Sequence, residues 1–104
     1  MYKIIVCDLD ETLISRDRTI SSENIEAIRK ATEAGVKFVP CTGRGYNSVH
    51  NTTSQLGLFD QKDQYVISYN GGAITENKDE KLLYFQGITF EEASSLYKIG
   101  LTYE

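Results

Sequence analysis

The sequence predicts an α/β fold built around a parallel sheet. Apolar runs at residues 3–7 and 36–40 and a β-rich run at 65–69 alternate with two stretches of helical spacing. This alternation favours parallel strands joined by right-handed crossovers and covered by helices. The chain has 104 residues, of which 40% are apolar and 25% charged. That length and composition are typical of one small globular domain with a single core.

The first third of the chain predicts a strand followed by a helix. Residues 3–7 form a continuously apolar run that ends at Asp8, as expected of a strand buried on both faces of a parallel sheet. Apolar residues then recur at helical spacing up to Gly35, and Ser21 stands where an N-cap is needed. These helix-spaced residues are Ile25, Ile28, Ala31 and Ala34.

The rest of the chain predicts a second strand and helix, a third strand, a hairpin and a last helix. The second helix runs from Tyr46 to Leu56 and is ended by Gly57. Asn70-Gly71-Gly72 closes the third strand as a turn, because all three residues tolerate positive φ. Residues 73–75 and 82–85 form the hairpin, and Thr89 with Glu92 forms a capping box for the final helix.

Charge and cysteine content restrict the class of partner and the compartment. The net charge of −4 disfavours nucleic acid and anionic membranes as general partners, so an anionic substrate needs local positive potential. Cys7 and Cys41 each end an apolar run, where a reduced, buried thiol is expected. The sequence has neither a transmembrane run nor a signal-peptide pattern, and we therefore expect a cytoplasmic protein.

Polar residues follow all three predicted parallel strands. Asp8, Thr42 and Asn70 stand at or just beyond the carboxyl ends of these strands. Ligands of open α/β sheets bind at that edge. The sequence therefore predicts a site where these three residues converge.

Two carboxylates, Asp8 and Asp10, follow the first strand two residues apart. A carboxylate in this place can attack a phosphoryl group or bind Mg²⁺, which prefers oxygen ligands. The second carboxylate is then near enough to protonate the leaving oxygen and later to deprotonate the hydrolytic water. Taken alone, the Asp-x-Asp spacing also fits a solvated acidic turn.

Thr42-Gly43-Arg44-Gly45 offers a hydroxyl, two glycines and a helix start, which together form a reasonable phosphate cradle. Taken alone, the segment also fits a plain loop between a strand and a helix. It is not the dinucleotide-binding fingerprint, because Ser48 occupies the position of the third glycine.

Four motifs together resemble the haloacid dehalogenase superfamily, specifically its Cof-type sugar-phosphate phosphatases. They are Asp8-Leu9-Asp10-Glu11-Thr12-Leu13, Thr19-Ile20-Ser21, Thr42-Gly43-Arg44 and Ser68-Tyr69-Asn70-Gly71-Gly72. The similarity covers essentially the whole chain. It implies a partial Rossmann-like sheet, the N-terminal half of the hydrolase core, at residues 1–86. Residues 87–104 would then be the first, truncated part of a cap domain.

The resemblance also implies roles for individual residues. Asp8 would be the nucleophile that forms an aspartyl phosphate, and Asp10 the general acid and base. Mg²⁺ would be bound by the Asp8 carboxylate and the Asp10 carbonyl. Thr42 and Gly43 would bind the phosphoryl group of a small phosphorylated metabolite, with Thr12 shaping the loop. Arg44 and Asn70 would line the substrate side.

The chain departs from the family pattern in two respects. Glu11 replaces the glycine common at that position, and this change touches no assigned role. The family's later lysine and aspartate motifs are not found, because Lys98 comes too soon and is expected to be a surface residue. Charges about 4 Å apart interact by about 4 kcal/mol at a dielectric of 20, so we expect this chain alone to bind Mg²⁺ weakly and turn over phosphate esters poorly.

Two other classes of protein share features of this sequence. One is a catalytically inert binding or regulatory module, or a truncated gene product, that self-associates through an unpaired sheet edge. The other is a response-regulator receiver, which is disfavoured because its acceptor aspartate belongs at the end of the third strand, where this chain has Asn70. His50, the only histidine, is expected to be a packed or half-exposed helix residue rather than a ligand.

Overall fold

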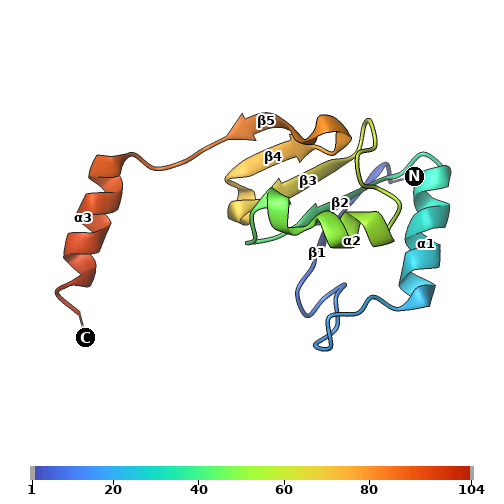
Figure 1. Ribbon diagram of the computed structural model, residues 1–104, viewed down its shortest axis with the longest axis horizontal. Helices are drawn as coiled ribbons and strands as arrows, with labels where there is room; N and C mark the ends of the chain where they lie inside the picture. Colours follow the sequence, from blue (N-terminus) through green and yellow to red (C-terminus); the bar gives the residue numbers. More distant parts are fainter. Residues whose placement is uncertain (1, 104) are drawn as a thin grey trace.

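A computed structural model, which describes residues 2–103, contains one five-stranded mixed sheet in the order β1-β2-β3-β4-β5 (Figure 1). The first three strands are parallel, and β4 and β5 extend the sheet as antiparallel strands. The predicted α/β class with a parallel sheet and a hairpin is therefore confirmed. The strands are β1 (Ile4–Asp8), β2 (Lys37–Cys41), β3 (Tyr65–Ser68), β4 (Ala73–Glu76) and β5 (Lys81–Phe85).

Helix α1 (Ser22–Glu33) forms as its apolar spacing predicts. The Ser21 hydroxyl accepts a hydrogen bond from the Asn24 N–H at 3.1 Å, which satisfies one of the unpaired donors of the first turn. Gly35 follows the helix with a φ of 94°, a left-handed conformation that glycine adopts without steric cost. The helix thus begins and ends where the sequence indicates.

The prediction of one continuous second helix is wrong. A 3₁₀ turn, η1 (Tyr46–Ser48), and a short α2 (His50–Gln55) replace it, with Val49 between them at φ −111° and ψ 9°. The segment is rich in Asn, Ser and Thr, whose side chains compete for backbone hydrogen bonds. The Ser48 hydroxyl donates to the Gly45 carbonyl at 2.9 Å, which favours the tighter first turn.

The end of β3 also differs from the expectation. The strand ends at Ser68, and the 3₁₀ turn η2 (Tyr69–Gly71) follows it. Positive φ begins at Tyr69 and ends at Gly71, whereas Gly72 has a φ of −72°. The turn predicted over residues 70–72 is therefore present but lies one residue earlier.

The core is built largely by the segment that follows β1. Leu9 has no exposed surface, and three more apolar residues of this segment are buried in one cluster with side chains of α1 and β2 and of the residues that flank α2. These three residues are Leu13, Ile14 and Ile20. Burying this loop fixes the backbone that carries the two aspartates.

Strand β1 is not buried on both faces, contrary to the prediction. Ile4, Ile5 and Val6 expose 55%, 42% and 54% of their surfaces. The apolar run suits a central strand, but among the described residues β1 pairs only with β2, so one edge and parts of both faces are open. Cys7 and Cys41 are free thiols that are half-buried rather than buried.

Helix α3 (Phe90–Gly100) stands away from the sheet at the end of an extended segment (Figure 1). The predicted capping box is present, with Thr89 and Glu92 each accepting from the other's backbone N–H at 3.0 Å. The 3₁₀ turn η3 (Lys78–Glu80) joins β4 to β5. No helix within residues 2–103 is long and apolar enough to cross a lipid bilayer.

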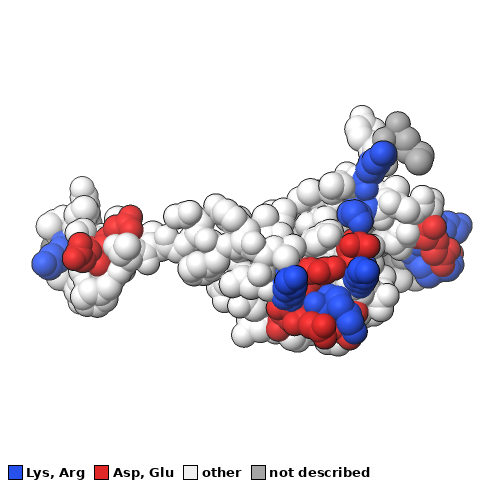
Figure 2. Space-filling model, turned by 90° about the horizontal axis from the view of Figure 1, so that it is seen from above, with Lys and Arg blue, Asp and Glu red and all other residues white. Residues whose placement is uncertain are grey.

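Charged side chains of both signs lie side by side on the face shown in Figure 2. Lysines and arginines do not form a continuous basic stripe there, and the segment leading to α3 is uncharged. The face in view therefore lacks the electrostatic pattern of a nucleic-acid-binding surface.

Candidate active site at the carboxyl ends of the parallel strands

The loop after β1 holds its shape through main-chain hydrogen bonds and buried side chains. The Leu9 carbonyl accepts from the N–H groups of Thr12 and Ile14, and the Asp8 carbonyl accepts from Leu13 N–H. Leu9 and its apolar neighbours anchor the loop from below. The exposed Asp8 and Asp10 are thereby held above the sheet edge.

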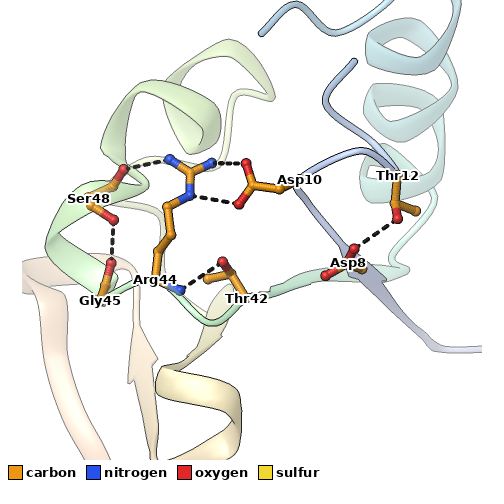
Figure 3. Close-up of polar contacts among 7 residues, drawn as sticks. All are labelled: Asp8, Asp10, Thr12, Thr42, Arg44, Gly45 and Ser48. Carbon is orange, nitrogen blue, oxygen red and sulfur yellow. Dashed lines mark hydrogen bonds and ion pairs between the residues drawn. The ribbon is translucent and has the colours of Figure 1, made fainter. Parts of the chain in front are cut away.

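One oxygen of the Asp8 carboxylate is fixed by its own loop. The Thr12 hydroxyl donates to Asp8 Oδ2 at 2.8 Å (Figure 3). No hydrogen bond from a described residue reaches Oδ1. Asp8 thus has one oriented oxygen and one available to an electrophile or a cation, as a nucleophile requires.

The strand register places the second motif beside Asp8. Asp8 is the partner of Cys41 in the parallel pair, so Thr42 lies one residue beyond that pair. Thr42 is buried, and its Oγ1 accepts from Arg44 N–H at 3.0 Å. The Thr42 hydroxyl therefore stabilises the bend at the end of β2, and this bend lies next to the loop after β1.

Asn70 completes the bend from the end of β3. Its N–H donates to the Thr42 carbonyl at 3.0 Å. A Cβ atom at Gly43 would come to 3.0 Å from Asn70 Oδ1, so any larger residue at position 43 would push the Asn70 amide aside. The structure thus brings Thr42, Gly43, Arg44 and Asn70 together at one edge, as the sequence predicts.

Arg44 makes a contact that the sequence analysis did not anticipate. Its Nε and Nη2 donate to the two carboxylate oxygens of Asp10, both at 3.2 Å, and Nη1 donates to the Ser48 carbonyl at 3.3 Å (Figure 3). Asp10 and Arg44 are 34 residues apart, so no local pattern could reveal the pair. Only their shared place at the edge of a parallel sheet hints at it.

The oxygen atoms of this loop fit a hard divalent cation. The Asp10 carbonyl accepts no hydrogen bond from the described residues, and Asp8 Oδ1 is likewise without a donor. Within residues 2–103, no group of three or more His, Cys, Asp or Glu side chains converges. Mg²⁺ commonly takes one or two protein oxygens and completes its shell with water and phosphate, so this sparse set suits it.

Glu11 carries a backbone cost that the sequence analysis did not foresee. Its φ is 59°, in the left-handed region that glycine occupies freely and other residues enter at roughly 1–2 kcal/mol. The replacement of glycine by Glu11 thus has a conformational cost, although it changes none of the assigned roles. The loop that carries both aspartates is strained at the residue between Asp10 and Thr12.

Two titratable residues lie outside this site, as predicted. His50 is half-exposed, bonds Glu80 and packs edge-on against Phe59, beside a separate cavity of about 160 Å³. Lys98 lies exposed on α3, away from the sheet. Neither residue contributes to the candidate site around Asp8.

A mixed α/β sheet with an Asp-x-Asp loop beside a Thr-Gly-Arg bend defines the class of the haloacid dehalogenase-like hydrolases. The sequence family of that description matches residues 5–104. This chain belongs to that family.

Named relatives and a solved structure show the same similarity. The chain is 42% identical over 72 residues to a Bacillus subtilis protein named 5-amino-6-(5-phospho-D-ribitylamino)uracil phosphatase YwtE, covering 69% of this chain and 23% of that protein. It is 32% identical over 82 residues to HMP-PP phosphatase of Yersinia pestis, covering 79% of this chain and 29% of that one. A haloacid dehalogenase-like hydrolase from Bacteroides thetaiotaomicron superposes with a TM-score of 0.81 and 30% identity, over 98% of this chain and 38% of its own.

The chain spans less than two-fifths of the length of the curated relatives it matches. What those proteins do as wholes therefore bears on this chain only by inference.

Proposed function

We propose that the chain carries the nucleophile half of a Cof-type, Mg²⁺-dependent phosphohydrolase site. The observation that carries the proposal is the placing of Asp8 beside the Thr42 bend, on paired neighbouring strands. Within residues 2–103, no donor reaches Asp8 Oδ1, while Thr12 orients Oδ2. The Asp8 carboxylate and the Thr42 bend thus lie together at the edge where open α/β sheets bind ligands.

The reaction has two steps. An Asp8 carboxylate oxygen bonds to phosphorus as the ester P–O bond breaks, and the leaving oxygen takes a proton from Asp10. Water then attacks the aspartyl phosphate, gives a proton to Asp10 and releases inorganic phosphate. The Thr42 hydroxyl and the Gly43 backbone hold the phosphoryl oxygens throughout, and Asn70 supports the bend from β3.

Asp10 contacts a leaving group only when its pair with Arg44 loosens, because the guanidinium engages both carboxylate oxygens in the structure. The pair is exposed on both sides, so opening costs about 1 kcal/mol or less. Arg44 is then free to contact the substrate, the role the resemblance implies.

Asp8 and the Asp10 carbonyl would hold Mg²⁺, with water or substrate oxygens in its other positions. A bound divalent cation offsets the repulsion between Asp8 and an anionic phosphate. Among the described residues no N–H donates to the Asp10 carbonyl, which supports this assignment.

Binding of a phosphoryl mimic tests this site without requiring turnover. In ¹⁹F NMR, beryllium trifluoride with Mg²⁺ should give bound resonances with the wild-type chain. Asp8→Asn or removal of Mg²⁺ should abolish them. Glu23→Gln, which changes an exposed carboxylate on α1, is the matched control and should retain them. Bound signals that persist in Asp8→Asn would contradict the assignment of the nucleophile.

The substrate class we propose is a small phosphorylated metabolite in the cytoplasm. Two relatives are named as phosphatases of a phosphoribitylamino-uracil and of HMP-PP, which supports a small phosphate ester. The net charge of −4 argues against nucleic acid or an anionic membrane as partner. We further propose that residues 1–86 belong to the hydrolase core and residues 87–104 to the beginning of a cap.

A second candidate is an inert module that self-associates, and the open edge of β1 favours it. Ile4, Ile5 and Val6 leave apolar surface and an unpaired edge exposed among the described residues. Size-exclusion chromatography with light scattering should then show a dimer or larger species of wild type that Val6→Lys dissociates. Leu101→Lys, at an exposed apolar residue of the last turn, is the control. A monomeric wild-type chain would remove this candidate.

A further inference from the structure

A polar cavity of about 320 Å³ lies beside Asp10, between the loop after β1 and the helix α2. Its lining includes two buried apolar residues, Ile14 and Ile20, and the buried hydroxyl residue Thr52. Arg18, Arg44 and the amides Asn51 and Gln55 line its sides. Nothing in the reaction described above uses Arg18, Asn51 or Gln55.

The charge of this cavity is opposite to that of the whole chain. Asp10 is the one acidic residue in its lining, and both of its oxygens are engaged by Arg44. Among the ion pairs of residues 2–103, none involves Arg18. The cavity therefore presents one uncompensated guanidinium in a chain whose net charge is −4.

A tight turn fixes the position of Arg18. Its N–H donates to the Ser15 carbonyl at 2.8 Å, and Ser15 N–H donates to the Thr19 carbonyl at 2.9 Å. Asp17 accepts from both the N–H and the hydroxyl of Thr19, which lowers the pKa of Asp17 and keeps it charged within the turn. Arg18 itself has a φ of 68°, so its backbone adopts a defined, strained conformation.

The position of Asp10 shows what would enter this cavity. A general acid must lie next to the oxygen of the leaving group, because it donates its proton there. With phosphorus at Asp8 and Thr42, the rest of the ester extends past Asp10 and Arg44, and both of these residues line the cavity. This step rests on the proposed function.

We propose that Arg18 is a specificity-determining residue that binds a second anionic group on the leaving portion of the phosphate ester. The preferred substrate class is thus a small phosphate ester that carries a carboxylate or a further phosphate. Asn51 and Gln55 add hydrogen-bonding groups for a hydroxylated carbon chain between the two anions. A guanidinium suits either anion, because its fixed fork of donors matches both geometries.

Two matched esters test this inference with Mg²⁺ present. Propyl phosphate and 3-phosphooxypropanoate have three-carbon chains and differ in whether the chain ends in a methyl group or a carboxylate. In NMR titrations, wild type should bind the carboxylate ester about twofold to fivefold more tightly, as an exposed charge pair provides. The preference should shrink as salt is raised, because the contact is partly open to solvent.

The variants separate Arg18 from charge in general. Arg18→Gln should equalise the two dissociation constants, mainly by weakening the binding of 3-phosphooxypropanoate. Arg16→Gln removes an arginine two residues away that pairs with Glu11 outside the cavity, and it should retain the preference. Circular dichroism of both variants confirms that the fold is kept.

The outcomes distinguish this inference from the proposed function. If wild type binds both esters equally, or if Arg18→Gln keeps the preference, Arg18 does not select the leaving group, and the Asp8 site is unaffected. If neither ester binds and the beryllium trifluoride signals are also absent, both proposals are wrong.

Discussion

The guanidinium of Arg44 holds both carboxylate oxygens of Asp10, each at 3.2 Å, and so joins the loop after β1 to the bend after β2. The same guanidinium donates to the Ser48 carbonyl, which ties the pair to the turn η1. One arginine thus links three segments around the site. In the proposed reaction, this contact would also control when Asp10 is available for proton transfer.

A double-mutant cycle measures the Arg44–Asp10 contact. Arg44→Ala and Asp10→Ala should each lower the free energy of unfolding, with a coupling of about 0.5–1 kcal/mol because the pair is exposed. Urea unfolding of the four proteins gives the coupling directly. A coupling of zero would mean that the pair does not organise the site.

Glu11→Gly should stabilise the chain by about 0.5–1 kcal/mol, because glycine adopts the left-handed φ of 59° without strain. Glu11→Ala is the control: it also removes the exposed contact with Arg16 but keeps a Cβ. Thermal unfolding should rank glycine above wild type and alanine at or below it. Equal stability of the two variants would show that position 11 is not strained.

The hydrogen bond from Thr12 to Asp8 should matter for reactivity rather than for stability. Thr12→Val removes the donor at nearly constant volume and should lower phosphorylation of Asp8 about tenfold, the loss expected for one charge-assisted bond. Thr12→Ser keeps the hydroxyl and should retain the reaction. If Val and Ser behave alike, the hydroxyl does not position Asp8.

Burial raises the pKa of the Cys7 thiol, and the neighbouring Asp8 carboxylate raises it further. In Cys41→Ser, alkylation of Cys7 by iodoacetamide should therefore become rapid at a higher pH in the folded chain than in the denatured chain, whose thiol has the ordinary pKa of about 8.5. The folded chain keeps this proton to higher pH than the unfolded chain does, so its free energy of unfolding should fall as pH rises past about 8.5. The denatured chain is the control, and equal pH profiles would contradict the prediction.

Local sequence patterns were sufficient to predict the features that depend on interactions between residues close together in the sequence. Ser21 caps α1, and Thr89 and Glu92 form their box, because each interaction spans three residues. The apolar runs predicted the strands, and the polar residues at their ends predicted which side chains converge. Fold class and candidate site thus follow from short-range periodicity and sheet geometry.

Local sequence patterns gave wrong or incomplete predictions where contacts between distant segments determine the structure. The burial of β1 depends on neighbours that its own residues cannot specify, so Ile4 and Val6 were expected to be buried and are exposed. The break at Val49 reflects competition between side chains and backbone in a segment with helical apolar spacing. The Asp10–Arg44 contact joins residues 34 positions apart, which no periodicity marks.

Chemical trapping of the phosphorylated residue tests the central claim most directly. Incubation with acetyl phosphate and Mg²⁺, followed by borohydride, converts an aspartyl phosphate to homoserine, which peptide mass spectrometry locates even when turnover is slow. We predict homoserine at position 8 in wild type and none in Asp8→Asn. Modification at Asp10 instead, or at neither residue while the chain remains folded, would contradict the account.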